Sequence, residues 1–391
     1  MRSVKPADQI LDVALEDLLG RRQAYLDEEL VRERIQDKVV MVTGAAGSIG
    51  SELCRQIAGF NPFALVAFDQ AEALLRQLES ELAERFPRLV LHSEIGNIIC
   101  FDHVNRAVQQ YKPTIVFHAA ASKHVPMLEQ EPLTAVENNI FGTWQVAEAA
   151  ARHGIEYFVM ISTDKAVRPV SMMGVTKRVA ELVLHAFEKE WSTKFLAVRF
   201  GNVLGSSGSV VPIFKSQIAA GGPVTVTHPE MRRYFMTASE AGQLVLEALV
   251  LGSGGETFVL DMGEPVKILD LAKQLILLSG LQPGRDIEIE FTGVRPGEKL
   301  FEELSLHDEQ LTPTSHSRIS SLASSENVDT ERVAVLVKEL REAVNARDAL
   351  RVILLLKDAV PDYAPGPQLL ENAISMRSNH DIALDVQVRC G

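Results

Sequence analysis

The sequence contains little cysteine. Cys54, Cys100 and Cys390 are the only three among 391 residues. They lack the spacing of a metal motif, and three cysteines are too few for a disulfide framework. We therefore expect no metal site, and we expect a reducing compartment, the cytoplasm, as the location of the protein.

Positive charge and long apolar runs are also scarce. The 39 Lys and Arg residues are outnumbered by 52 Asp and Glu residues, which gives a formal net charge of -13. Such a chain repels phosphate polyanions, and no basic run offers a local exception, so we expect no nucleic-acid partner. No segment reaches the roughly 18 uninterrupted apolar residues of a membrane span, and the N-terminus has no signal-peptide core. Membrane association is therefore not expected.

What the sequence does contain is a regular alternation of strand and helix patterns. Residues 1–37 are charged and amphipathic, and apolar residues at helical spacing before Gly20 predict a short helix. From Lys38, the segments KVVMVT, FALVAF, LVLHSEI, TIVFHAAA and the strand before Ser162 predict five strands with helices between them. This pattern predicts an α/β fold with a doubly wound parallel sheet of the Rossmann type.

The first strand is followed by a glycine motif, TGAAGSIG. Gly44 would permit the tight turn, Gly47 a close approach of the backbone to a pyrophosphate, and Gly50 close packing of the next helix. The second strand ends in Asp69, whose carboxylate can accept hydrogen bonds from adenosine ribose hydroxyls. The same carboxylate would repel a 2′-phosphate, so the motif predicts NAD in preference to NADP.

Further cofactor contacts are expected around this motif and after the third and fourth strands. Small side chains in HAAA would let a cofactor lie against the sheet, although simple packing explains them equally well. The expected contacts besides the three glycines and Asp69 are Ser48, Ile49, Asn97, Ile98, Ala119, Ala120 and Ala121.

The stretch from Val159 to Lys177 combines charges with a strand end. Ser162, Thr163, Asp164 and Lys165 directly follow an apolar strand, at the edge of a parallel sheet where ligands bind. Met173 and Lys177 are four residues apart and share one face of the next helix. Taken alone, a helix cap with a solvated charge would explain Asp164 and Lys165.

Other polar residues suggest a substrate site. A diphosphate needs guanidinium partners, and an acidic chain has to concentrate them locally, although a solvated surface explains each Arg equally well. Asn138 and Asn139 inside a predicted helix suggest a backbone hydrogen-bond role or a surface position. The candidate substrate-binding residues are Lys123, His124, Asn202, Ser209, Val210, Arg233, Arg295 and Glu298.

These residues divide the chain into four parts. We expect a helical preamble (1–37), an NAD-binding Rossmann domain (38–205), a smaller and mainly substrate-binding α/β region interleaved with the sheet (206–330), and a helical C-terminal appendage (331–391).

Together the motifs resemble those of a known family. They are DLLGR, TGAAGSIGSEL, HAAASKHVP, STDKA, MGVTK, RFGNVLGSSGSVVP, RRYFM and VRPGEKLFEEL, spread over about residues 15–320. In these the chain resembles the extended short-chain dehydrogenase/reductase superfamily, and within it the UDP-N-acetylglucosamine 4,6-dehydratases of bacterial polysaccharide and glycan biosynthesis. Asn97 departs from the Asp that is common at its position.

The resemblance implies roles for the central stretch. Thr163 matches the superfamily's active-site Ser or Thr, and Lys177 matches the lysine that holds the nicotinamide ribose. Met173 stands where most of the superfamily has a catalytic tyrosine. The similar large sugar-nucleotide dehydratases also have Met at this position. Lys165 would remove the C5 proton of the sugar and Asp164 would protonate the departing C6 hydroxyl. For this we expect Lys177 and burial to lower the pKa of Lys165.

The resemblance also implies a substrate and an assembly. We expect NAD-dependent conversion of UDP-N-acetylglucosamine or a related UDP-sugar, with retention at C5. A C5-inverting dehydratase and a UDP-sugar 4-epimerase are alternatives, and Met173 suggests a non-catalytic NAD-binding regulator as a third. Similar proteins commonly pair through two helices, here about 132–152 and 171–190, so we expect a homodimer or a higher homo-oligomer. The apolar residues that suggest this contact are Val146, Ala149, Val179, Leu182 and Val183.

Overall fold

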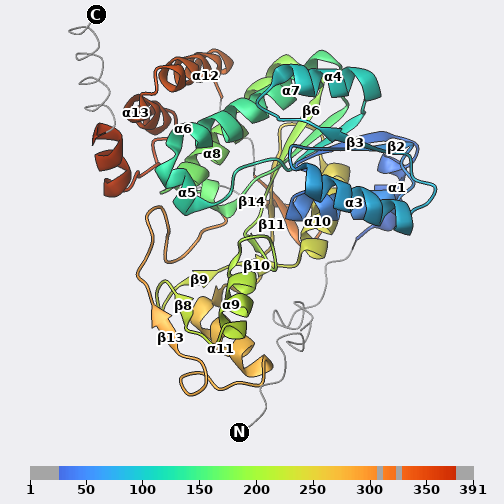
Figure 1. The fold of residues 1–391 in the computed structure, drawn as a ribbon. Coiled ribbons are helices and arrows are strands. Elements are labelled where there is room, and N and C mark those ends of the chain that lie inside the picture. The colour runs from blue at the N-terminus through green and yellow to red at the C-terminus, as the bar shows by residue number, and fades with distance from the viewer. Residues whose placement is uncertain (1–25, 306–310, 323–327, 376–391) are drawn as a thin grey trace, which may run out of the picture.

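A computed structural model describes residues 26–305, 311–322 and 328–375 (Figure 1). The helix expected before Gly20 and the DLLGR motif lie outside the described residues. The first described element is helix α1 (Glu28–Ile35), which buries Val31 and Ile35. None of the helices described is long and apolar enough to cross a membrane.

The centre of the fold is a nine-stranded sheet with the order β14-β15-β11-β6-β5-β4-β1-β2-β3. All neighbours from β3 to β11 pair in parallel, and β15 is antiparallel to both β11 and β14. The strands are β1 (Val39–Thr43), β2 (Ala64–Asp69), β3 (Leu91–Ile95), β4 (Ile115–His118), β5 (Tyr157–Ile161), β6 (Lys194–Arg199), β11 (Thr257–Leu260), β14 (Leu311–Pro313) and β15 (Ile319–Leu322).

Helices cover both faces of this sheet, which confirms the predicted doubly wound Rossmann-type fold. One apolar core joins a face of the sheet to α1, α2 (Ser48–Ala58), α3 (Glu72–Arg85) and α10 (Ala238–Leu251). A second core joins the other face to α4 (Phe101–Tyr111), α7 (Gly142–Arg152) and α8 (Met172–Glu190). The inner strands are buried on both sides because helices pack on each, which is why β1, β2, β4, β5 and β6 read as apolar runs.

A smaller lobe lies beyond one edge of the main sheet, at the bottom of Figure 1. Its own apolar core includes Phe214, Val224 and Ile276. The elements of the lobe and its connections are β7 (Asn202–Val203), α9 (Val210–Ala219), β8 (Val224–Val226), β9 (Arg232–Arg233), β10 (Phe235–Met236), β12 (Val266–Lys267), α11 (Ile268–Leu278) and β13 (Ile289–Phe291). β11, β14 and β15 return to the main sheet, so this part of the chain is interleaved with it.

One long helical run changes its hydrogen-bond pattern in the middle. After α5 (Val125–Gln130), the run α6 (Pro132–Val136), η2 (Glu137–Phe141) and α7 continues without a break, and η2 is a π-helical turn. Such turns often occur at functional sites. The turn holds Asn139, whose amide accepts a hydrogen bond from Ser122 N at 2.8 Å and donates to Ser122 O at 3.0 Å. The backbone role that we suggested for the Asn pair is therefore confirmed for Asn139.

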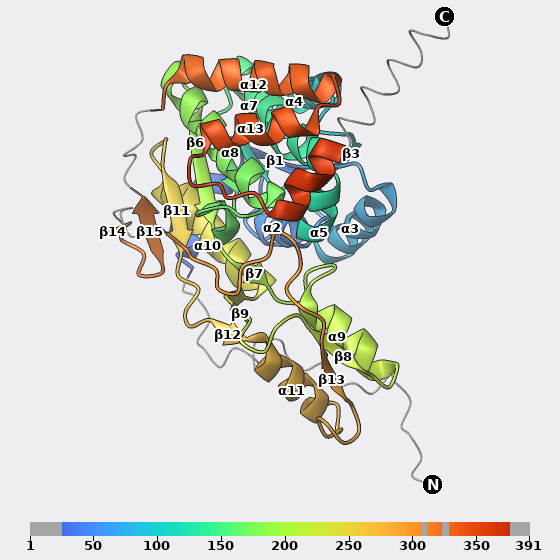
Figure 2. The same cartoon turned by 90° about the vertical axis from the view of Figure 1, so that its left-hand side faces the viewer.

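The C-terminal helices α12 (Thr330–Asn345) and α13 (Ala349–Ala359) pack on this same face. They share one apolar core with α6, η2, α7 and α8, and Figure 2 shows them lying across α8. Val146, Ala149, Val179 and Val183 are all buried within the single chain. These four side chains are therefore covered within one chain while Leu182 is partly exposed, and the expected pairing of two copies through the helices at 132–152 and 171–190 stays a prediction.

Candidate functional site

The candidate site lies at the carboxyl ends of the parallel strands. The chain runs from β1 outward through β2 and β3, and then returns to the other side of β1 with β4. Ligands bind at such a reversal of strand order, because the loops there diverge and leave a crevice. The loops after β1, β2, β4 and β5 all open at this edge, so the predicted motifs meet in space.

The glycine loop after β1 requires its glycines for steric reasons. Gly44 has φ 70°, and a Cβ atom there would lie 2.5 Å from Ala120 N. A Cβ atom at Gly50 would lie 2.0 Å from the carbonyl oxygen of Gly44, so α2 can pack this close only without a side chain. Gly47 is the N-cap of α2. The first amides of α2 are thus presented at the loop, in an arrangement that favours an anion.

A pocket of about 170 Å³ opens beside this loop. Eight of the predicted cofactor contacts line it: Gly44, Gly47, Asp69, Asn97, Ile98, Ala119, Ala120 and Ala121. Five lining residues were not predicted: Phe68, Gln70, Gly96, Ser122 and Asn138. All of these except Asn138 adjoin a predicted residue in the sequence, so widening the search by one position finds them.

Asp69 forms part of the pocket wall with a fixed carboxylate. Its Oδ2 accepts a hydrogen bond from Ala46 N at 2.9 Å, and its Oδ1 accepts one from Ala71 N at 2.9 Å. Each oxygen keeps a further lone pair for a ligand hydroxyl. An open helix N-terminus, a glycine cradle and a fixed carboxylate therefore fit a dinucleotide.

Three predicted cofactor contacts and Lys177 are not in the pocket lining. Ser48 begins α2, and its Oγ accepts a hydrogen bond from Ser207 N at 3.2 Å. Ile49 packs against the apolar core, and Gly50 is buried under the loop. Lys177 is buried in α8, and burial lowers its pKa to about 8 although Glu181 opposes the shift. A buried ammonium of low pKa is typical of a functional lysine.

The fully buried Asp164 and the partly buried Lys165 form an ion pair just after β5. Lys165 Nζ lies 2.9 Å from Asp164 Oδ1 and 3.0 Å from Asn202 Oδ1. Thr163 donates its hydroxyl to the same Asp164 oxygen at 2.9 Å. Asp164 is fully buried, and its Oδ2 has no hydrogen-bond partner within the described part of the chain. A helix cap with a solvated charge was the alternative explanation of these two residues, and the burial of Asp164 argues against it.

Sequence reasoning missed one member of this centre, Glu302. Its Oε1 lies 3.8 Å from Lys165 Nζ and 3.8 Å from Arg233 Nε. Burial lowers the pKa of Lys165, but Asp164 and Glu302 outweigh it, so the net shift is upward. The expected lowering of this pKa is thus wrong for the site as it stands. The motif VRPGEKLFEEL contains Glu302, yet nothing in its spacing distinguishes this glutamate from its neighbour Glu303.

A buried charge network of Ser162, Glu181 and Arg199 joins α8 to the sheet. Arg199 is fully buried and donates to both oxygens of Glu181, at 2.8 Å and 2.7 Å. Ser162 donates to Glu181 at 2.6 Å. Burial raises the pKa of Glu181, but Arg199 outweighs it and brings the pKa down to about 2. The network fixes α8 relative to β5 and β6, and with it Met173, which is buried near the helix start.

The predicted substrate-binding residues fall into two groups. Asn202 and Arg233 belong to the centre around Lys165, because Asn202 accepts a hydrogen bond from Lys165 and Arg233 lies 3.8 Å from Glu302. Lys123 and His124 lie after β4, and burial lowers the pKa of both side chains. His124 also packs on Gly208, where a Cβ atom would lie 2.4 Å from the ring.

The remaining predicted residues lie at the edges of the site. Ser209 caps α9 and its Oγ is buried with no partner among the described residues, and Val210 begins that helix. The Arg295 side chain is about half exposed and pairs with Glu298, another predicted residue, at 2.7 Å.

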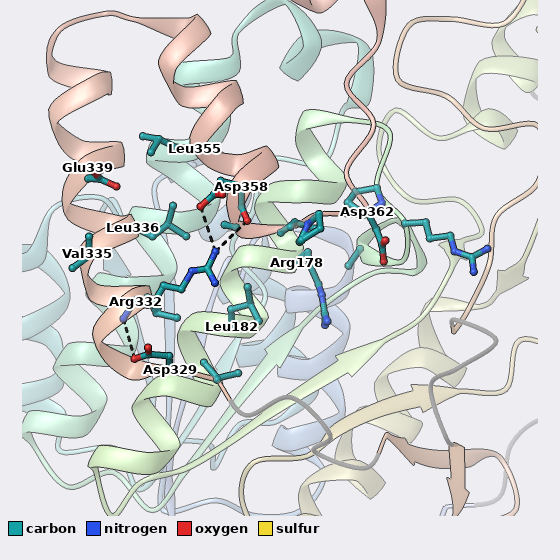
Figure 3. A pocket seen from close by; sticks show the side chains of 18 of the residues that line it. Arg178, Leu182, Asp329, Arg332, Val335, Leu336, Glu339, Leu355, Asp358 and Asp362 are labelled. Carbon is teal, nitrogen blue, oxygen red and sulfur yellow. Dashed lines mark hydrogen bonds and ion pairs between the residues drawn. The ribbon is translucent and has the colours of Figure 1, made fainter.

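A larger cavity of about 490 Å³ lies behind the loop that follows Lys165 (Figure 3). It is bounded by residues 166–169, by Arg178 and Leu182 of α8, and by α12 and α13. Across it Arg332 pairs with Asp358 at 3.3 Å. No predicted site residue lines this cavity, and its charges are mixed, so it is not the candidate active site.

Comparison with known relatives places the chain in a family. The family model described as "Polysaccharide biosynthesis protein" matches residues 40–324. The probable polysaccharide biosynthesis protein EpsC of Bacillus subtilis is 53% identical over 317 residues, which are 80% of this chain and 53% of that protein. The capsular polysaccharide biosynthesis protein CapD of Staphylococcus aureus is 51% identical over 305 residues, 76% of this chain and 51% of that protein. The chain thus spans about half the length of these relatives.

Weaker similarity is found to a UDP-glucose 4-epimerase and to the solved structure of Pen. A UDP-glucose 4-epimerase of Rickettsia rickettsii is 32% identical over 283 residues, 70% of this chain and 79% of that protein. The X-ray structure of Pen from Bacillus thuringiensis has 35% identity and a TM-score of 0.69, over 75% of this chain and 90% of that chain.

At the level of the fold alone, the chain is similar to DesIV of Streptomyces venezuelae, a dTDP-glucose 4,6-dehydratase solved with NAD. The identity is 20% and the TM-score 0.60, over 68% of this chain and 88% of that chain. Both the fold and the resemblance predicted from the sequence are confirmed. The chain belongs to the polysaccharide biosynthesis protein family that includes EpsC and CapD.

Proposed function

We propose that this protein is an NAD-dependent UDP-N-acetylglucosamine 4,6-dehydratase that retains the configuration at C5. The observation that carries the proposal is the ion pair of the partly buried Lys165 with the fully buried Asp164, which follows β5 at the sheet edge where the glycine-loop pocket also lies. A protein that only bound NAD would have no use for this pair. Membership of a polysaccharide biosynthesis family supports a sugar nucleotide as the substrate.

The residues around the glycine loop would hold the cofactor. Asp69 would accept the ribose hydroxyls, the first amides of α2 would face the pyrophosphate, and Lys177 would hold the nicotinamide ribose. When bound, NAD accepts a hydride from C4 of the sugar and returns it to C6. The fixed carboxylate of Asp69 disfavours the extra phosphate of NADP.

The ion pair is one proton transfer away from the acid and base that dehydration needs. If Lys165 passes a proton to Asp164 across their 2.9 Å contact, the lysine becomes a neutral base and the aspartic acid a proton donor. A sugar that covers the centre excludes water and so disfavours two charges relative to two neutral groups. Lys165 would then remove the C5 proton, and Asp164 would protonate the leaving C6 hydroxyl. Thr163 contacts Asp164 and is a candidate for handling the O4 proton in place of the usual tyrosine.

Proton NMR of UDP-N-acetylglucosamine incubated with the purified protein tests this proposal. A C6 methyl signal together with a C4 ketone or its hydrate is the expected product, with the C5 configuration unchanged. A product inverted at C5 would instead indicate an inverting dehydratase.

A UDP-sugar 4-epimerase is the second candidate, favoured by the 32% identity to an enzyme of that name. An epimerase has no need of a proton donor for a leaving C6 hydroxyl, which the Asp164–Lys165 pair would supply. UDP-N-acetylgalactosamine as the product, with no C6 methyl signal, would select the epimerase.

A further inference from the structure

We propose that Glu302 is a positioning residue of the candidate centre, which keeps Lys165 protonated and directed at Asp164 until a substrate covers the site. Its role in turnover rests on the proposed function, but its contacts do not.

The contacts place Glu302 opposite Asp164 across one ammonium group. Glu302 Oε1 lies 3.8 Å from Lys165 Nζ, and Asp164 Oδ1 lies 2.9 Å from the same nitrogen. The Glu302 side chain is 3% exposed, and its Oε2 has no hydrogen-bond partner within the described residues. Leaving a buried carboxylate oxygen unpaired costs free energy. A glutamate with no role in the centre would not be held there at that cost.

The residues next to Glu302 make contacts on two sides, with the loop that follows Lys165 and with the small lobe. Lys299 Nζ donates to the carbonyl oxygen of Val167 at 2.9 Å, and Glu303 pairs with Arg168 at 3.3 Å. On the side of the small lobe, Arg232 N donates to the carbonyl oxygen of Leu300 at 3.0 Å. These contacts hold the segment against the loop that carries Lys165, so the Glu302 carboxylate cannot turn away to water.

The charges nearby determine the direction of the effect. Lys165 faces two carboxylates, Asp164 and Glu302, and one cation, Arg233; Glu302 faces Lys165, Asp164, Arg233 and Lys299. A negative charge beside an ammonium stabilises the charged form and raises its pKa. Removing the charge of Glu302 should therefore lower the pKa of Lys165.

Competitive labelling tests this without substrate. A small amine-reactive reagent, applied to the full chain over a pH series, labels Lys165 in proportion to its neutral form, and mass spectrometry reads the peptide that contains it. Glu302→Gln, which keeps the shape and removes the charge, should lower the apparent pKa of Lys165 by about one unit. Glu303→Gln is the matched control: it removes a neighbouring carboxylate that contacts Arg168 instead, and should leave this pKa in place.

A second variant keeps the test decisive if Glu302→Gln does not fold. Glu302→Asp retains the charge farther from Lys165 and should lower the same pKa by a smaller amount. An unchanged labelling profile of Lys165 in Glu302→Gln, or in Glu302→Asp if only that variant folds, would overturn the inference. With UDP-N-acetylglucosamine, the high-pH limb of kcat/KM, which reports loss of the proton that Lys165 shares with Asp164, should move to lower pH by the same interval in Glu302→Gln. A wild-type protein that does not dehydrate this sugar would refute the proposed function, while the labelling result would still decide the role of Glu302.

Discussion

Asp164 and Lys165 are adjacent in the sequence, but the chemistry available to them depends on distant residues. Asn202 accepts a hydrogen bond from Lys165 at 3.0 Å, and Glu302 lies 3.8 Å from the same ammonium. Together they fix the ammonium in a site where a proton can pass between two neighbouring side chains. The pair is therefore the most informative place to test the mechanism.

Both members of the pair should be dispensable for the first hydride transfer and required for dehydration. Lys165→Ala and Asp164→Asn should reduce bound NAD when UDP-N-acetylglucosamine is added, yet form roughly 10² to 10⁴-fold less dehydrated product. Absorbance of the reduced nicotinamide and proton NMR measure the two steps. Exchange of solvent deuterium at C5 should vanish in Lys165→Ala and persist in Asp164→Asn. Normal exchange in Lys165→Ala would remove Lys165 from the role of base.

Asp69 should determine the choice between NAD and NADP. Asp69→Asn keeps an acceptor for Ala46 N or Ala71 N but removes the negative charge. The ratio of the dissociation constants for NADP and NAD should fall by about tenfold, equivalent to roughly 1.4 kcal/mol. Calorimetric titration of the wild type and the variant with both cofactors measures the ratio. Equal affinity of the wild type for NAD and NADP would refute the prediction at once.

At the scale of elements, α8 carries two of the predicted catalytic residues, Met173 and Lys177, and a buried ion pair joins α8 to β6. Glu181 of α8 and Arg199 of β6 are both fully buried, and two hydrogen bonds join them. Breaking such a pair by removing one partner leaves a buried charge without its counterpart, which costs about 3–5 kcal/mol. The position of Met173 and Lys177 relative to the sheet therefore depends on this pair.

The same pair makes a prediction about pH. The pKa of Glu181 is about 2 in the folded protein, below its ordinary value of 4.5. The stabilisation that ionised Glu181 gives the folded protein is complete above about pH 4.5 and is lost as the pH falls toward 2. The difference in unfolding free energy between the wild type and Glu181→Gln should thus shrink by roughly 3 kcal/mol over that interval. Urea unfolding at a series of pH values measures it, and a constant difference would contradict the assignment.

At the scale of the whole molecule, α12 and α13 close one side of the protein. Their apolar residues share a core with η2 and α8, and Arg341 of α12 stacks 4.6 Å over the ring of Phe141. An apolar face of this kind would otherwise need a partner chain. The covering helices supply that partner within one chain.

Loosening α12 should therefore expose this face. Leu340 is fully buried in the shared core, and Leu340→Ala should lower the free energy of unfolding by about 2–5 kcal/mol. Leu340→Asp, which places a charge in the core, should in addition raise the mass in solution through self-association of the uncovered helices. Light scattering after size-exclusion chromatography measures the mass, with the exposed change Val335→Asp on the same helix as the control. An unchanged mass and stability in Leu340→Asp would show that α12 is not needed to cover the face.

The sequence by itself determined the first five strands of the main sheet with the helices between them, the glycine loop and the family. These follow from apolar periodicity, glycine sterics and motifs, which act among residues close together in the chain. Only the tertiary structure decided that Glu302 joins the centre, that Asn138 lines the pocket beside the loop, and that α12 and α13 cover α8. Contacts such as Lys299 with Val167 join residues 132 positions apart, and no local pattern encodes which of several similar side chains will make them. The raised pKa of Lys165 comes mainly from its neighbour Asp164, whose side chain the fold holds against the ammonium, and further from Glu302, which only the fold brings near.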